Sequence, residues 1–175
     1  MIRRRSSGPF LPQRDGTFRL NVAPDVTDLI VHLSGELRDV LTQADAGDPA
    51  LRRLFPAAYH NDAELDAEYQ ELMRGELTAS RLTALGRVIE VFTGPEKILT
   101  RGDMELFLQT TNAIRLLLGT MLDVSEDDPD GPDDQDDPED PDAGHHHLYA
   151  YLGWLLEAAV SALMSSSGGN PRESR

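Results

Sequence analysis

The amino-acid sequence predicts an all-α fold, a bundle of five or six helices within a chain of 175 residues. Apolar residues recur at three- and four-residue steps in several windows, which is the spacing of one helical face. Segments rich in Gly, Pro and Asp separate these windows, and residues that favour helix starts, such as Pro24 and Thr100, open them. The pattern leaves open whether a short N-terminal strand or hairpin accompanies the helices.

The N-terminal residues 1–16 are predicted to form a flexible basic arm. This arm contains a Ser-Ser-Gly-Pro run and Arg3, Arg4 and Arg5. From Thr17 to Val22, apolar and polar residues alternate, which is a weak strand signal. No partner run follows directly, so we expect an edge strand or part of a short hairpin.

Pro24 opens the first helix, because its fixed φ suits the first helical turn. The helix is expected to end before the breaker segment 45–49, and a short helix should follow up to Pro56. The first helix carries one apolar stripe, formed by Val26, Leu29, Ile30, Leu33, Leu37, Val40 and Leu41.

Asn61 and Glu64 have the spacing of a capping box, so a further helix is predicted to begin there. Its apolar pattern weakens at Gly75 and resumes near Thr78, which favours a separate helix from that point. Gly94 and Pro95 then stop the pattern. This division accounts for the higher of the two helix counts.

Two strongly apolar helices are predicted around an acidic segment, one from about Thr100 to Leu122 and one from Leu148 to about Met164. We expect them to pack as an antiparallel pair. The second is apolar nearly all round, so it is predicted to be buried or to form part of a subunit interface. The residues predicted for that dimer interface are Leu148, Tyr151, Leu152, Leu155 and Ala159.

The net charge of −15 has a local origin, because twelve acidic residues and no Lys or Arg lie between 123 and 142. The other 19 acidic residues nearly balance the 16 basic ones. We therefore predict one helical domain at 17–165, with a disordered acidic loop at 123–144 and a disordered tail at 166–175. The residues predicted for partner contact are Arg3, Arg4, Arg5, Glu126, Asp127, Asp128, Asp133, Asp134, Asp136 and Asp137.

No catalytic motif is present, so the sequence predicts a protein that is not an enzyme and has no cofactor. There is no cysteine, no Gly-x-Ser-x-Gly elbow and no phosphate-binding glycine loop. His145, His146 and His147 lie beside the acids and could take up a metal, although adjacent residues do not make a preorganised site. We predict no metal site, and a metal-binding protein or metal-dependent enzyme using this tract stays as an alternative.

Localisation and partner class follow from the same features. The absence of disulfides and of a secretory signal predicts a cytoplasmic protein, and no segment reaches the roughly 20 apolar residues that a bilayer requires. None of the predicted helices has a basic face, and an acidic loop is repelled by phosphates. We therefore expect no sequence-specific DNA binding, no membrane contact and a protein partner.

Three sequence blocks together resemble a known family. They are residues 54–62 (LFPAAYHND), 112–120 (NAIRLLLGT) and 151–155 (YLGWL). Their order and spacing are similar to those of an actinobacterial family of uncharacterised domains that includes the oxidative-stress transcriptional regulator AosR, over most of residues 18–165. The resemblance implies a regulator that acts through a sigma factor or RNA polymerase. The redox sensing ascribed to that regulator requires cysteines, which this chain lacks.

The leading functional prediction is therefore a non-enzymatic regulatory protein that acts through protein–protein contacts. Its charged arm or acidic loop would modulate a contact made by the helical bundle. A helical dimerisation module that uses the last helix is a further alternative, alongside the metal-dependent one.

Overall fold

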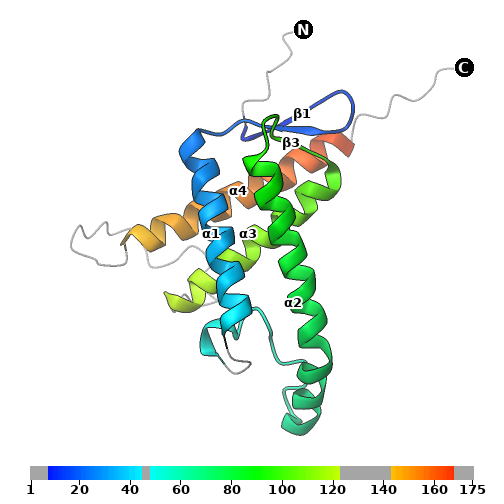
Figure 1. Ribbon diagram of the computed structural model, residues 1–175, viewed down its shortest axis with the longest axis vertical. Coiled ribbons are helices and arrows are strands. Elements are labelled where there is room, and N and C mark those ends of the chain that lie inside the picture. The colour runs from blue at the N-terminus through cyan, green and yellow to red at the C-terminus, as the bar shows by residue number, and fades with distance from the viewer. Residues whose placement is uncertain (1–7, 45–47, 123–142, 168–175) are drawn as a thin grey trace, which may run out of the picture.

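The computed structural model describes residues 8–44, 48–122 and 143–167. Within these ranges it contains four α-helices, one 3₁₀ turn and a small three-stranded sheet (Figure 1). The chain is mostly helical, as predicted, but the expected count of five or six helices is wrong. Two local features in the first half of the chain account for the smaller number of helices.

The first helix, α1 (Pro24–Gln43), begins where Pro24 predicts it to begin. The expected short helix before Pro56 is only a 3₁₀ turn, η1 (Pro49–Leu51). Asp48 caps this turn by accepting a hydrogen bond from the Ala50 amide at 2.8 Å. The turn is too short to add a helix to the bundle.

The second helix, α2 (Ala63–Thr93), is continuous through Gly75. Its N-cap is Asp62, whose side chain accepts from the Leu65 amide at 3.0 Å, so the predicted capping box at Asn61 is one residue too early. A single helical Gly costs only about 1 kcal/mol relative to Ala, which does not break a helix of 31 residues. The N-terminal half of α2 projects beyond the other helices (Figure 1).

The last two helices are α3 (Arg101–Met121) and α4 (Ala143–Ser167). They pack against each other and run in opposite directions (Figure 1), which confirms the predicted pairing. The start of α3 at Thr100 is also confirmed, with a capping box to Asp103. By contrast, α4 begins five residues before Leu148 and continues to Ser167, so it overlaps the ends of the predicted loop at 143–144 and of the predicted tail at 166–167.

The sheet consists of β1 (Phe10–Pro12), β2 (Phe18–Leu20) and β3 (Ile98–Leu99), all antiparallel, in the order β1-β2-β3. Phe10 pairs with Leu20, and Phe18 pairs with Leu99. The hairpin partner that the sequence did not reveal therefore lies within residues 1–16, which were expected to form a flexible arm.

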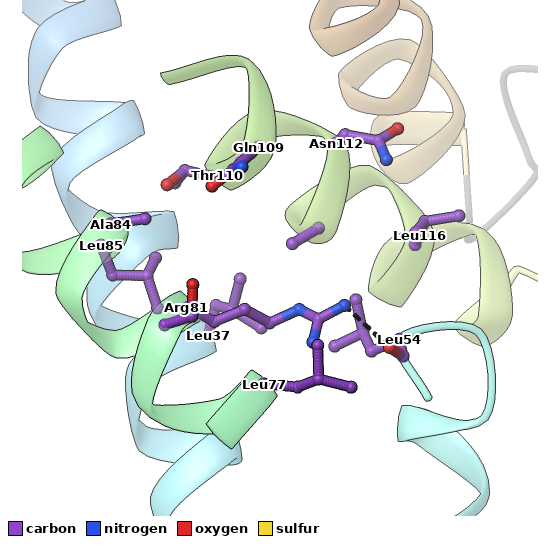
Figure 2. Close-up of a pocket in the computed structure, with 12 residues that line it drawn as sticks. Leu37, Leu54, Leu77, Arg81, Ala84, Leu85, Gln109, Thr110, Asn112 and Leu116 are labelled. Carbon is purple, nitrogen blue, oxygen red and sulfur yellow. Dashed lines mark hydrogen bonds between the residues drawn. The ribbon is translucent and has the colours of Figure 1, made fainter. Parts of the chain in front are cut away.

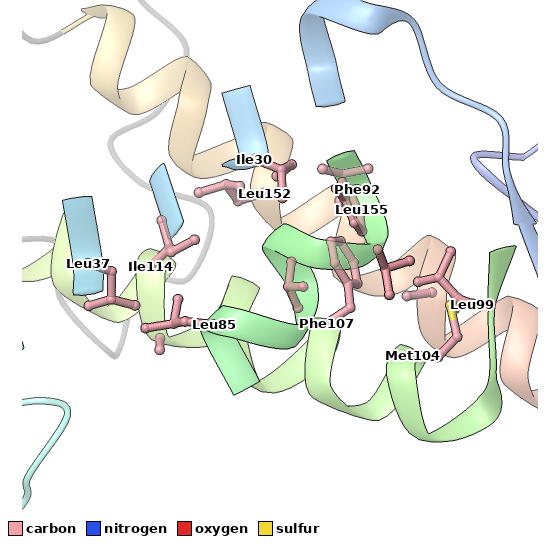
Figure 3. Close-up of a cluster of buried hydrophobic side chains, with 14 of the residues drawn as sticks. Ile30, Leu37, Leu85, Phe92, Leu99, Met104, Phe107, Ile114, Leu152 and Leu155 are labelled. Atoms are coloured by element: carbon pink, nitrogen blue, oxygen red, sulfur yellow. The ribbon is translucent and has the colours of Figure 1, made fainter. Parts of the chain in front are cut away.

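The core lies where the four helices meet, and the sheet covers one end of it. The Phe107 ring of α3 stacks on Phe92 of α2 at 5.4 Å and contacts Phe10 of β1 at 5.1 Å between ring centroids. Every α-helix and β3 contribute buried side chains to this cluster (Figure 3), including Ile30, Leu37, Leu85, Leu99, Met104, Ile114, Leu152 and Leu155.

Candidate functional site

A cleft of about 250 Å³ lies between α2 and α3 (Figure 2). Leu37 of α1 and Leu54 also line the cleft, so three helices and the segment after η1 enclose it. Ser80, Gln109 and Asn112 are exposed at its rim. The remaining lining residues are Leu77, Arg81, Ala84, Leu85, Thr110, Ala113 and Leu116, so none of the acidic side chains that the structure describes faces the cavity.

Arg81 crosses the cleft from α2 toward the segment after η1 (Figure 2). Its Nη2 donates a hydrogen bond to the Leu54 carbonyl oxygen at 2.8 Å, and its Cζ lies 4.9 Å from the centroid of the Phe55 ring. Its Nη1 is buried and has no hydrogen-bond partner in the part of the chain that the structure describes. Burial lowers the pKa of Arg81, because removal from water disfavours the charged form. Within the described residues no carboxylate forms an ion pair with it.

A second polar group in the cleft lacks a partner. Thr110 is 2% exposed, and its buried Oγ1 forms no hydrogen bond with any of the described residues. Other helical threonines of this chain, such as Thr42 and Thr83, donate to the carbonyl four residues earlier. The cleft thus combines an unpaired cation and an unsatisfied hydroxyl with apolar walls.

The outer face of α4 is a second feature that could contact another molecule. Trp154 is 49% exposed, Val160 44% and Met164 71%, and together with exposed Glu157 they follow one side of the helix. A shallow depression runs along this outer face between Leu156 and Ser165. We call Trp154, Glu157, Val160 and Met164 the outer face of α4.

The composition of α4 also meets the length and hydropathy test for a membrane span, over Ala143–Ser166. Its inner face carries Leu152, Leu155, Ala159 and Leu163, all buried against the rest of the chain. In this fold α4 therefore has one buried face, while most of its span-like segment is not buried, since the buried share is 28%.

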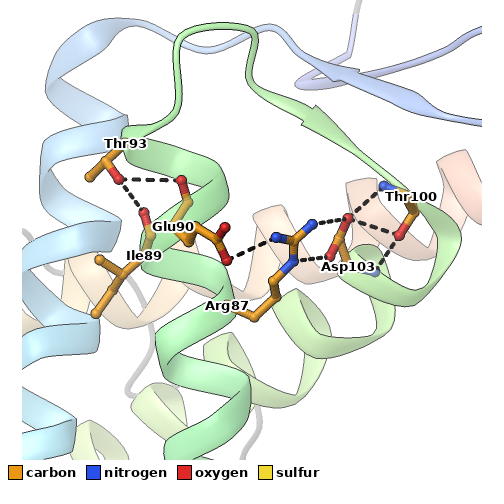
Figure 4. A network of polar contacts seen from close by, with 6 residues as sticks. All are labelled: Arg87, Ile89, Glu90, Thr93, Thr100 and Asp103. Atoms are coloured by element: carbon orange, nitrogen blue, oxygen red, sulfur yellow. Dashed lines mark hydrogen bonds and ion pairs between the residues drawn. The ribbon is translucent and has the colours of Figure 1, made fainter.

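A polar network joins α2 to the start of α3 (Figure 4). The Nε of Arg87 donates to Asp103 Oδ1 at 2.7 Å, and its Nη1 donates to Glu90 Oε2 at 2.9 Å. The Thr100 amide and hydroxyl donate to Asp103 Oδ2. Every group in this network has a partner, so its role is to fix the two helices relative to each other.

The residues predicted for a dimer interface lie mostly inside the fold. Leu152, Leu155 and Ala159 are at most 1% exposed, and Leu148 and Tyr151 are half-buried. In this fold α3 and β1 of the same chain cover the face that carries Leu152, Leu155 and Ala159. A dimer through the last helix stays a prediction, with Leu148 and Tyr151 as its more accessible residues.

The other predicted site residues fall into two groups. Arg3, Arg4 and Arg5 and the acidic residues from Glu126 to Asp137 lie outside the described residues. The tract His145–His147 is the first turn of α4, not a flexible strand. Consecutive helical residues point in different directions, which weighs against a shared metal ion.

Comparison with known proteins identifies the family. Residues 7–163 match the family described as Domain of unknown function (DUF2017). The chain belongs to this family. Relatives named "Oxidative stress regulator AosR", from Mycobacterium bovis and Mycobacterium tuberculosis, are 27% identical over 190 aligned residues, covering 87% of this chain and 85% of theirs. The resemblance found in the three blocks is thus confirmed. No solved structure matches the chain.

Two of the three sequence blocks contribute residues to the cleft. Leu54 comes from the first block, and Asn112, Ala113 and Leu116 come from the second. Sequence reasoning missed the cleft, although one signal was available. Arg81 lies midway between Leu77 and Leu85 at four-residue steps, so it occupies an otherwise apolar helical face.

Proposed function

We propose that this protein is a non-enzymatic, cytoplasmic regulator that acts by binding another protein through the outer face of α4. The observation that carries the proposal is the exposure of Trp154, Val160 and Met164 on a helix whose other side belongs to the core. Contact surfaces in protein complexes are enriched in exposed aromatic residues and Met. The name of the AosR relatives supports a regulatory role.

The chemistry of the outer face suggests what the partner presents. Glu157 is exposed among apolar neighbours, and no ion pair is formed by it within the described part of the chain. We therefore expect an apolar groove that contains a basic residue opposite Glu157. A sigma factor or RNA polymerase, the partners implied by the family resemblance, is the first candidate to test.

Trp154 is the sole tryptophan of the chain, so its fluorescence reports directly on this surface. The test measures the affinity of the purified protein for the RNA polymerase and for each sigma factor of the source bacterium. Binding is followed by a label on the partner, so that variants without Trp154 can be compared. Trp154→Ala and Glu157→Lys should each weaken binding at least tenfold, a loss of about 1.4 kcal/mol.

Leu72→Ala is the matched control, because Leu72 is 79% exposed on α2, away from α4. Binding that falls with Leu72→Ala but not with Trp154→Ala would place the contact elsewhere. Absence of binding to any of these transcription proteins would refute the proposed partner class.

A further inference from the structure

Arg81 is in an electrostatic situation that a folded protein normally avoids. A guanidinium taken partly out of water usually gains a carboxylate or a full set of hydrogen bonds, since an uncompensated charge is costly. Here the compensation consists of the Leu54 carbonyl oxygen and the face of the Phe55 ring. Across residues 8–44, 48–122 and 143–167, Nη1 has no partner and the lining of the cleft contains no acidic residue.

Thr110 supplies a second unsatisfied group to the same cavity. Its hydroxyl forms no hydrogen bond, whereas Thr42, Thr83 and Thr120 each donate to the carbonyl four residues earlier in their helices. Thr111 also lacks a partner, but it does not line the cleft. Among the described residues, the cleft is therefore lined by one buried cationic donor and one buried hydroxyl that lack partners, in addition to the exposed hydroxyl of Ser80.

The rest of the cavity is amphipathic. Leu37, Leu77, Leu85 and Leu116 form apolar walls, and exposed Gln109 and Asn112 give a polar rim. Its volume of about 250 Å³ lies just below the usual range of ligand pockets, roughly 300–1,000 Å³, which limits the occupant to a small molecule.

We propose that this cleft binds a small organic carboxylate, with the carboxylate at Arg81 and Thr110 and the apolar part against the leucine walls. A carboxylate matches the guanidinium in charge and in planar geometry. A phosphate fits less well, because its further negative charge would face a single cation within apolar walls. The inference goes beyond the proposed protein contact and does not depend on it.

Binding requires a local movement, because Arg81 Nη1 and Thr110 Oγ1 are both shielded from solvent. The Arg81 side chain has several rotatable bonds, so it can turn its donors toward the cavity without a change in the helices. The ligand should therefore affect residues of α2 and α3 beside the cleft, and leave the sheet unchanged.

The test uses the full-length, ¹⁵N-labelled protein and follows amide resonances in NMR spectra. The probes are hexanoate and benzoate, with hexanol and benzamide as neutral counterparts and inorganic phosphate as a second anion. At least one of the two carboxylates should shift the amides of Leu85, Thr110 and Ala113 at about millimolar concentration, the affinity expected of so small a ligand. Neutral probes and phosphate should shift them far less.

Arg81→Met should lower the affinity for that carboxylate at least tenfold, and Thr110→Val should lower it several-fold. Arg19→Met is the matched control, because Arg19 is exposed on β2. This variant should bind the carboxylate with the affinity of the wild type. The proposal is overturned if neither carboxylate shifts these amides, or if the neutral counterparts or phosphate bind as well. It is equally overturned if both cleft variants keep the wild-type affinity. Thr110→Val keeps the test decisive should Arg81→Met fail to fold.

Discussion

Arg81 and Arg87 lie six residues apart on α2 and have opposite electrostatic surroundings. Arg87 donates to Asp103 and Glu90, and these bonds raise its pKa further above the ordinary value of an arginine. Arg81 has no carboxylate partner among the described residues, and burial lowers its pKa. Identical side chains on one helix thus serve different purposes. Arg87 fixes α2 relative to α3, and Arg81 leaves a donor for a ligand.

Asp103 makes the stability of the fold depend on pH. Burial by itself raises the pKa of this carboxyl, but hydrogen bonds from Arg87 and Thr100 outweigh burial, so the net pKa lies below the ordinary value. A pKa lowered on folding gives stability that is fully present above the unfolded value of about 3.9. That stability is lost as the pH falls through the lower, folded value.

Asp103→Asn should reduce the free energy of unfolding by about 2 kcal/mol at neutral pH, because charged hydrogen bonds to Arg87 are lost. The difference in unfolding free energy from the wild type should begin to narrow below about pH 4, where the carboxyl becomes protonated in the unfolded chain. It should close as the pH falls through the lower pKa of the folded protein. Urea unfolding followed by circular dichroism at several pH values measures both effects. Asp39→Asn, at an exposed position of α1, should change little. A gap independent of pH would contradict this account.

At the scale of an element, α2 shows why a local helix breaker need not divide a helix. Gly75 lies in its interior, is exposed, and has open space where a Cβ would be added. Gly119 of α3 differs, since an added Cβ would lie 3.0 Å from both Arg53 Nη1 and a Tyr149 ring carbon. One glycine is tolerated by its helix, and the other permits α4 and the segment after η1 to approach α3 closely.

Gly75→Ala should therefore stabilise the protein by about 0.5–1 kcal/mol, the usual gain in helix propensity. Gly119→Ala should be less stable than Gly75→Ala by at least about 1 kcal/mol, because its neighbours must move to make room. Thermal unfolding of the two variants beside the wild type measures the difference. Equal gains at both positions would show that α3 and α4 are not as close as described.

At the scale of the whole molecule, α4 separates into a face that holds the fold together and a face open to solvent. Leu155 points into the common core and is 1% exposed, whereas the adjacent Trp154 is half exposed and contacts Tyr151 at 5.5 Å between ring centroids. Truncation of a side chain on the inner face of α4 should therefore destabilise the fold far more than truncation on its outer face.

Leu155→Ala should lower the free energy of unfolding by about 2–5 kcal/mol, because it leaves a cavity in the core. Trp154→Ala should cost less than about 1 kcal/mol, since most substitutions at exposed positions have small effects. Chemical denaturation followed by circular dichroism compares them without relying on tryptophan fluorescence. A larger loss for Trp154→Ala would indicate that the outer face is already covered within the chain.

Several features of this protein were determined by the sequence alone, because their causes are local. Pro24 and Thr100 start helices through backbone geometry and capping, which act within one turn. The strongly apolar character of α3 and α4, on either side of the acidic segment, was enough to predict that they pack together. The family resemblance rested likewise on short blocks of adjacent residues.

Only the tertiary structure decided the sheet, the inner face of α4 and the candidate cleft. β3 joins β2 across almost eighty residues of sequence, and no local pattern specifies such a pairing. Leu155 and Trp154 are both large and apolar, so only the position of α3 and β1 determines which of them is buried. Arg81 was visible as a charge on an apolar face, but its unpaired state depends on what α3 and Leu54 place around it. Burial and pairing are properties of contacts between distant segments, and the folded chain alone fixes those contacts.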